Sequence, residues 1–158
     1  MSRLRQGQFP LLLIILVIDV LARVDAKAAV SAPALDKAIS DYASLGLKVS
    51  ITELDVTIRG ESGGQFGFGR RRFGGPPPEP PKPQDLKAQA DAYARLFSIF
   101  IKHKTTMERV TFWGLSDRRT WRYGQHPLIF DSDNQRKPAY AAIVEAILHS
   151  TPKLALPK

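Results

Sequence analysis

Two short β-branched segments separated by a long amphipathic segment constrain the fold of this chain most strongly. Residues 48–56 alternate Val49 and Ile51 with polar residues, which predicts a short strand. Residues 109–114 predict a second strand of the same kind. Because strands joined through a helix are typically parallel neighbours, this order favours an α/β fold with a crossover helix.

Three helices are predicted around these strands. The first begins at Ser31 and Pro33 and ends before Gly46, and the second runs from a cap at Asp85 to about His103. The third opens at Pro138. The apolar faces that support these helices are Leu35, Ile39, Tyr42 and Leu45; Leu86, Ala90, Tyr93, Phe97, Phe100 and Ile101; and Tyr140, Ile143, Val144, Ile147 and Leu148.

Length and composition limit what the chain can be. Its 158 residues suffice for one domain but fall short of the roughly 200–250 residues of a complete βα barrel. The sequence has no cysteine, so it forms no disulfide and no thiolate metal site. The three histidines lack ligand spacing, and neither a metal nor another cofactor is predicted. The net charge of +8 is scattered, which is typical of solubility rather than of an anion-binding face.

Residues 1–30 resemble an export signal or a spurious leader. Arg3 and Arg5 precede the apolar run 11–18, and small residues follow, as in a secretory signal. The run ends at Asp19, too early for a membrane span, and a buried element of the domain is the alternative. We therefore expect a secreted protein without a membrane span.

The segment 60–83 interrupts the regular pattern. It is dense in glycine, proline and arginine and predicts an irregular inserted loop. Arg70, Arg71 and Arg72 lie among phenylalanines, as in some RNA-binding segments, but one short copy favours a surface loop, and no nucleic-acid partner is predicted. Residues 151–158 predict a frayed tail.

Two acids follow the first predicted strand. Glu53 and Asp55 lie at its C-terminal end, which faces the active site in a βα barrel. Two solvated acids at a strand exit are the alternative, and on the strand pattern alone this alternative is favoured.

Two tryptophans follow the second predicted strand, in a loop expected beside Glu53. Trp113 and Trp121 offer flat apolar faces that suit stacking on sugar rings, and a carboxylate between such faces suits polysaccharide cleavage. Core packing is an equal alternative for Trp113 and a weaker one for Trp121. Asp117 either holds this loop by accepting backbone N–H bonds or contacts substrate.

Five motifs occur in the order and spacing of one known family. ITELDV at 51–56, FWGLSD at 112–117, TW at 120–121, PLIFD at 127–131 and KPAY at 137–140 resemble the C-terminal part of glycoside hydrolase family 10. This family contains retaining endo-β-1,4-xylanases with a (β/α)8 TIM barrel. The resemblance runs from residue 31 to 149 without the 60–83 loop, and it implies barrel strands 7 and 8 with their flanking helices.

The resemblance also implies roles for single residues. Glu53 would be the catalytic nucleophile, and Trp113 and Trp121 would bind substrate, which is xylan or a related β-1,4-linked polysaccharide. Asp55 would be an acid of the nucleophile loop that supports the site without contacting substrate. Asp117 would be a further supporting acid.

One departure from the family pattern bears on activity. The family places its acid/base glutamate in an Asn-Glu pair on the fourth strand, and no such pair occurs in this sequence. We therefore expect this chain, an incomplete barrel with open edges, to be inactive alone and prone to self-association. The alternative function is a noncatalytic secreted protein that binds polysaccharide through Trp113 and Trp121.

Overall fold

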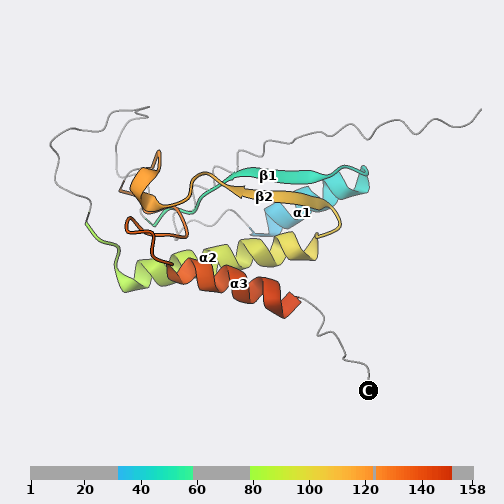
Figure 1. The fold of residues 1–158 in the computed structure, drawn as a ribbon. Helices are drawn as coiled ribbons and strands as arrows, with labels where there is room; N and C mark the ends of the chain where they lie inside the picture. The colour runs from blue at the N-terminus through green and yellow to red at the C-terminus, as the bar shows by residue number, and fades with distance from the viewer. Residues whose placement is uncertain (1–31, 59–78, 123, 151–158) are drawn as a thin grey trace, which may run out of the picture.

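The computed structural model describes residues 32–58, 79–122 and 124–150, which form an α/β unit (Figure 1). The elements follow one another as helix, strand, helix, strand, short 3-10 helix and helix. Their bounds are α1 Ala32–Ser44, β1 Val49–Leu54, α2 Pro83–Lys102, β2 Met107–Phe112, η1 Asp117–Arg119 and α3 Pro138–Ser150.

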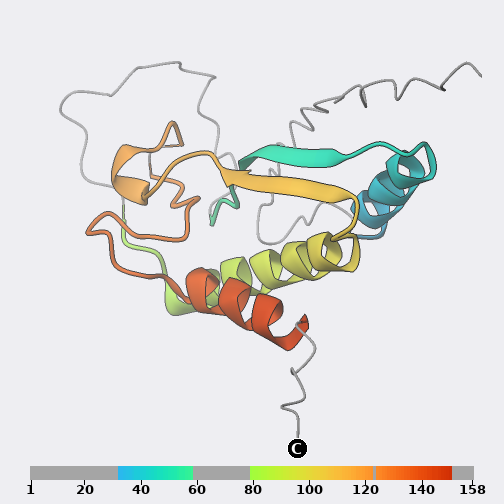
Figure 2. The same cartoon turned by 45° about the vertical axis from the view of Figure 1, so that its right-hand side comes forward.

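β1 and β2 form a two-stranded parallel sheet, as the sequence predicts. Ile51 pairs with Val110, and Leu54 pairs with Phe112. The long helix α2 makes the crossover between the strands and lies beside α3 on one side of the sheet (Figures 1 and 2). Because the strands are parallel, both end at the same edge of the sheet.

The hydrophobic core lies between the sheet and these helices. Val49 and Ile51 from β1 are buried with Tyr93 and Phe100 from α2. The ring of Phe97 stacks on that of Phe112 at a centroid distance of 6.2 Å, which joins α2 to β2. The apolar face predicted for α2 is therefore the face that packs on the strands.

Some element boundaries differ from the prediction. α2 begins at Pro83, the last residue of the loop predicted over 60–83, and Lys82 is its N-cap without a side-chain hydrogen bond. Asp85 is not the cap but lies in the first turn. The helix starts earlier because a proline at the first helical position already has the required φ, and its missing N–H would have had no partner within the helix. β2 begins at Met107, where pairing with β1 starts, and ends before Trp113.

Three apolar residues of α3 are exposed to solvent. Ala139 and Ile143 are buried, whereas Val144, Ile147 and Leu148 are 36%, 44% and 66% exposed. The helix prediction is confirmed, and Ala146 also packs against the core, but part of the predicted apolar face stays exposed.

The leader over 1–30, residues 60–78 of the predicted loop with Arg70, Arg71 and Arg72, and the tail over 151–158 lie outside the described residues. Within the residues that are described, no helix is both long and apolar enough to cross a membrane.

Candidate functional site

The predicted acids and the first tryptophan meet at the C-terminal edge of the sheet. Glu53 is half-buried near the end of β1, and Asp55 is buried just beyond it. Trp113 follows β2 directly, and its backbone N–H donates to the carbonyl of Leu54 at 3.2 Å. The parallel pairing therefore places Trp113 beside the strand end that carries Glu53.

Neither tryptophan is a core residue. Trp113 is 46% exposed and Trp121 is 54% exposed, so both rings offer apolar surface to solvent. This exposure removes core packing as the explanation of Trp113. Two half-exposed indoles in the segment after one strand are suited to stacking against a flat ligand.

Asp55 is bound to the second tryptophan and its neighbour. Its Oδ2 atom accepts a hydrogen bond from Arg122 Nε at 2.9 Å and another from Trp121 Nε1 at 3.2 Å. The Arg122 and Asp55 side chains are only 4% and 5% exposed. Arg122 Cζ also lies 4.1 Å from the centroid of the Trp121 ring, a cation–π contact.

Burial dominates the titration of Asp55. Desolvation raises the pKa of the Asp55 carboxyl above its ordinary value of 3.8, while the charge of Arg122 and the hydrogen bonds from Arg122 and Trp121 oppose this rise. The charge of Glu53 adds a smaller upward push on the same pKa. Arg122 therefore favours the ionised form of Asp55 against the effect of burial.

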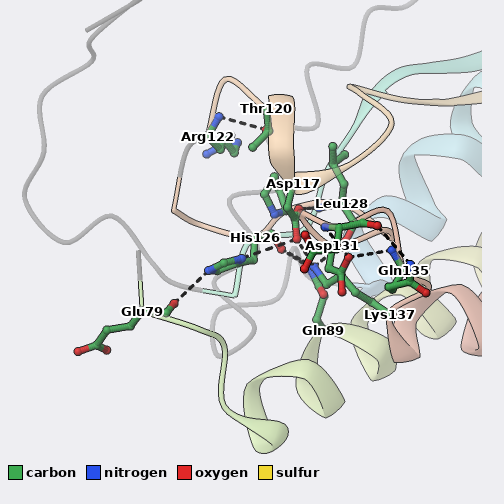
Figure 3. A network of polar contacts seen from close by, with 12 residues as sticks. Glu79, Gln89, Asp117, Thr120, Arg122, His126, Leu128, Asp131, Gln135 and Lys137 are labelled. Carbon is green, nitrogen blue, oxygen red and sulfur yellow. Dashed lines mark hydrogen bonds and ion pairs between the residues drawn. The ribbon is translucent and has the colours of Figure 1, made fainter. Parts of the chain in front are cut away.

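Asp117 is at the centre of a second buried network (Figure 3). Its Oδ1 atom accepts the backbone N–H of Leu128 at 2.8 Å, and its Oδ2 atom accepts Lys137 Nζ at 2.9 Å. His126 Nδ1 lies 3.7 Å from the same Oδ2. Of the two roles open to Asp117 from the sequence, the backbone hydrogen bond shows the loop-holding one.

Lys137 ties this network to the start of α3. Its Nζ atom also donates to the carbonyls of His126 at 2.8 Å and Leu128 at 2.7 Å. Together with the hydrogen bond to Asp117, Lys137 Nζ makes three hydrogen bonds. Desolvation lowers the pKa of Lys137 from 10.5, and the charge of Asp117 opposes that shift. This buried cation is held by acceptors on three sides.

The loop is also fixed to α2. Gln89 Nε2 donates to the carbonyls of Val56 at 2.6 Å and His126 at 2.7 Å, and the Tyr93 hydroxyl donates to that of Pro127 at 2.7 Å. The site edge is thus built on a rigid frame from α2 and α3.

The residue patterns did not single out Arg122, Lys137 or Gln89. Lys137 belongs to the KPAY motif, and Arg122 directly follows the TW pair, so the motifs contained a signal for both. Gln89, a polar residue between alanines of α2, belongs to none of these motifs, yet it is fully buried.

An open hollow of about 320 Å³ lies on the same loop, lined by Leu115, Ser116, Arg118, Arg119 and Asn134. Arg118 and Arg119 are exposed, in contrast to the buried Arg122. No cluster of three or more His, Cys, Asp or Glu side chains suited to a metal ion occurs in the described part of the chain.

A parallel strand–helix–strand unit with acids and exposed tryptophans after the strand ends is compatible with part of a βα barrel. Residues 23–146 match the model of glycosyl hydrolase family 10, and the chain belongs to this family.

Curated relatives agree with this assignment. The chain is 45% identical over 104 residues to an endo-1,4-beta-xylanase/feruloyl esterase of Xylanibacter ruminicola, covering 65% of this chain and 14% of the relative. It is 37% identical over 120 residues to endo-1,4-beta-xylanase A of Caldicellulosiruptor saccharolyticus, covering 70% of this chain and 31% of the relative. The chain thus spans less than a third of either relative.

Solved structures show the same partial correspondence. A family 10 xylanase with a bacterial Ig-like domain, from termite gut, superposes with a TM-score of 0.63 at 32% identity, covering 75% of this chain and 26% of that one. A glutamate-to-alanine mutant in complex with xylotriose gives a TM-score of 0.56 at 35% identity, covering 72% and 34%. The predicted fold class, the C-terminal part of a TIM barrel, is confirmed.

Proposed function

We propose that this chain carries the nucleophile and part of the xylan-binding surface of a retaining endo-1,4-beta-xylanase site, with Glu53 as the nucleophile. The observation that carries the proposal is the half-buried Glu53 near the end of β1, next to the strand end from which the exposed Trp113 and Trp121 follow. Membership in the family adds the reaction class.

The chemistry assigned to Glu53 is covalent. Its carboxylate attacks the anomeric carbon of a xylosyl unit, the bond to the leaving sugar oxygen breaks, and a glycosyl ester forms. The leaving oxygen takes a proton from a second carboxyl group, and water then hydrolyses the ester with retention of configuration. Trp113 and Trp121 would hold the sugar rings by stacking.

The second carboxyl group is the part that this sequence does not supply in the family's form. Its only asparagine, Asn134, is followed by Gln135, so there is no Asn-Glu pair. We therefore propose that the chain alone binds xylan fragments but does not turn over xylan, because an unprotonated xylosyl oxygen is a poor leaving group.

A reactive substrate analogue tests Glu53 without needing that acid. In 2,4-dinitrophenyl 2-deoxy-2-fluoro-β-xylobioside the dinitrophenolate departs without protonation, and the fluorine slows hydrolysis of the ester. We expect a stable adduct on the Glu53 peptide by mass spectrometry. Glu53→Gln should abolish the adduct, whereas Glu145→Gln, an exposed position on α3, should leave it unchanged. Labelling of another carboxylate, or none, would contradict the nucleophile role.

A second function of a different class is noncatalytic binding of polysaccharide in a secreted protein. The same exposed Trp113 and Trp121 support it. Sedimentation of the chain with insoluble xylan, lost in Trp121→Ala, together with no adduct from the fluorinated analogue, would favour this alternative. Analysis of culture medium from the source would test the predicted secretion.

The predicted self-association also awaits measurement. The exposed Ile147 and Leu148 of α3 would favour it. Light scattering after size exclusion would detect an oligomer that Leu148→Lys should dissociate, and a monomer at all concentrations would contradict it.

A further inference from the structure

We propose that Arg122 is the positioning residue of the sugar-binding surface: it fixes the indole of Trp121, through Asp55, relative to the strand that carries Glu53. This inference rests on the proposed function, since it assigns a role within the same site. It goes beyond that function because it names the residue that decides where one stacking face lies.

Three contacts among Trp121, Asp55 and Arg122 fix the orientation of the indole. Trp121 Nε1 donates to Asp55 Oδ2 at 3.2 Å, which fixes one edge of the ring. Arg122 Nε donates to the same oxygen at 2.9 Å. The guanidinium carbon of Arg122 lies 4.1 Å from the indole centroid, so it covers one face of the ring. With one edge and one face occupied, Trp121 is still 54% exposed, so its free face can contact a ligand.

Arg122 suits this role better than a lysine would. A guanidinium is planar, so it can stack on the indole while its Nε–H points in its own plane at the carboxylate. A lysine ammonium could neutralise Asp55 but would not form a flat support for the ring. Arg118 and Arg119 on the same loop are exposed, so burial distinguishes Arg122 from its neighbours.

Asp55 connects this support to the candidate nucleophile. It lies two residues after Glu53, where the chain leaves β1, and Val56 next to it donates its N–H to the carbonyl of Pro127 at 3.1 Å. The backbone that carries Glu53 therefore also positions Asp55, which accepts the hydrogen bond from Trp121. A single substitution of Arg122 removes this linkage without changing the identity of Glu53 or Trp121.

The consequence concerns binding rather than the chemical step. A free indole rotates among several rotamers, so a ligand that needs one of them must bear the entropy of ordering it. With Arg122 in place, that ordering is complete before the sugar arrives. Loss of the support should therefore weaken binding of a xylo-oligosaccharide, with the stacking residue itself unchanged.

The experiment uses the whole chain labelled with 15N at its tryptophans. Two indole N–H signals are expected, and Trp121→Phe identifies that of Trp121. In Arg122→Lys we expect the Trp121 signal to shift and broaden, the Trp113 signal to stay in place, and the affinity for xylotriose to fall by about tenfold, equivalent to about 1.4 kcal/mol. Arg119→Lys is the matched control at an exposed arginine of the same loop and should change neither signal nor affinity.

A second variant guards against a folding effect. Asp55→Asn keeps an oxygen acceptor for the indole but removes the charge that holds Arg122, so it should also broaden the Trp121 signal. Melting curves verify that the variants remain folded. An unchanged Trp121 signal together with unchanged xylotriose affinity in Arg122→Lys would overturn the positioning role. If the unsubstituted chain binds no xylotriose, the proposed function fails, while the indole signals still decide whether Arg122 orients Trp121.

Discussion

Two buried carboxylates lie on the site edge, and they perform opposite tasks. Asp117 uses both oxygens to hold the main chain at Leu128 and the buried Lys137. Asp55 uses one oxygen, Oδ2, to receive the side chains of Arg122 and Trp121. Asp117 thus fixes the path of the loop, whereas Asp55 fixes what the loop presents to solvent. The same residue type therefore holds the main chain at one position and two side chains at the other.

The largest effect is expected at Asp117. Asp117→Ala leaves Lys137 without its counter-ion and the Leu128 N–H without its acceptor. Breaking a buried ion pair in this way should lower the free energy of unfolding by about 3–5 kcal/mol. Urea denaturation followed by circular dichroism measures it. The double variant Asp117→Ala with Lys137→Met should recover part of the loss, because no unpaired charge remains.

Asp131 provides a control for the effect of burial on the stability loss at an aspartate. Asp131 accepts the N–H groups of Asp133 and Gln135 in the same region but is only half-buried. Asp131→Ala should therefore cost less, about 1 kcal/mol. Equal losses at the two aspartates would contradict the special role of Asp117.

A smaller effect is expected at Gly114, where the loop backbone lies close to the side chain of Leu128. Gly114 has φ of +140°, and a Cβ there would lie 2.9 Å from Leu128 Cδ1. Gly114→Ala should cost about 1–3 kcal/mol through backbone strain and this contact. Gly46→Ala, at φ +73° with open space around it, should cost less. Thermal melts compare the two, and a larger loss at Gly46 would refute the steric argument.

At Asp55 the effect should depend on pH. Burial raises the pKa of Asp55 above 3.8 in the folded state. At a pH between 3.8 and this raised pKa, the folded state therefore keeps a proton that the unfolded state has lost. The free energy of unfolding therefore falls as pH rises from about 3.8 through the raised pKa. Arg122→Met should raise that pKa further, so its cost of about 1–3 kcal/mol at neutral pH should shrink on acidification.

Urea denaturation at a series of pH values tests this expectation. Asp55→Asn lacks the titrating carboxyl, so its stability should not show this contribution. A cost of Arg122→Met that is the same at every pH would contradict the dependence of Asp55 on its arginine.

The smallest effect, of opposite sign, is expected at Asp36. Hydrogen bonds from Lys102 and then from His103 lower the pKa of this partly exposed carboxyl. Its contribution to stability is therefore present above the ordinary pKa of 3.8 and is lost as pH falls through the lowered value. The stability of Asp36→Asn should depend less on pH in that acidic range, and an unchanged pH profile would remove this contact as a contributor.

Periodicity was enough to predict the two strands and the three α-helices, because the apolar positions Val49 and Ile51 of β1 and the apolar face of α2 are buried. The burial of Ser50 on β1 departs from strict alternation, and the short helix η1 was not predicted. The ends of the elements were harder to predict. β2 extends back to Met107 only because Val49 pairs with it, and no local pattern contains that contact. For the same reason the sequence of α3 shows an apolar face on which Val144, Ile147 and Leu148 nevertheless stay exposed.

The site likewise contains residues that local patterns predict and partners that only long-range contacts reveal. Glu53, Asp55, Trp113, Trp121 and Asp117 follow from strand ends and motifs, and the structure brings them to one edge. Their catalytic and binding roles stay predictions. The partners that fix them, Arg122 to Asp55 and Lys137 to Asp117, are 67 and 20 residues away in sequence. Long-range pairs of this kind depend on the folded path, so residue spacing alone did not reveal them.

The parallel pairing of β1 with β2 also governs the order in which the molecule can assemble. Ser50 on β1 contacts Glu108 on β2 across 58 residues of sequence, and α2 must return the chain before the two strands can meet. Closing so long a loop slows folding much more than it weakens the final state, because its entropic cost grows only with the logarithm of its length. The edge that carries Glu53 and Trp113 should therefore be among the last parts of the molecule to form.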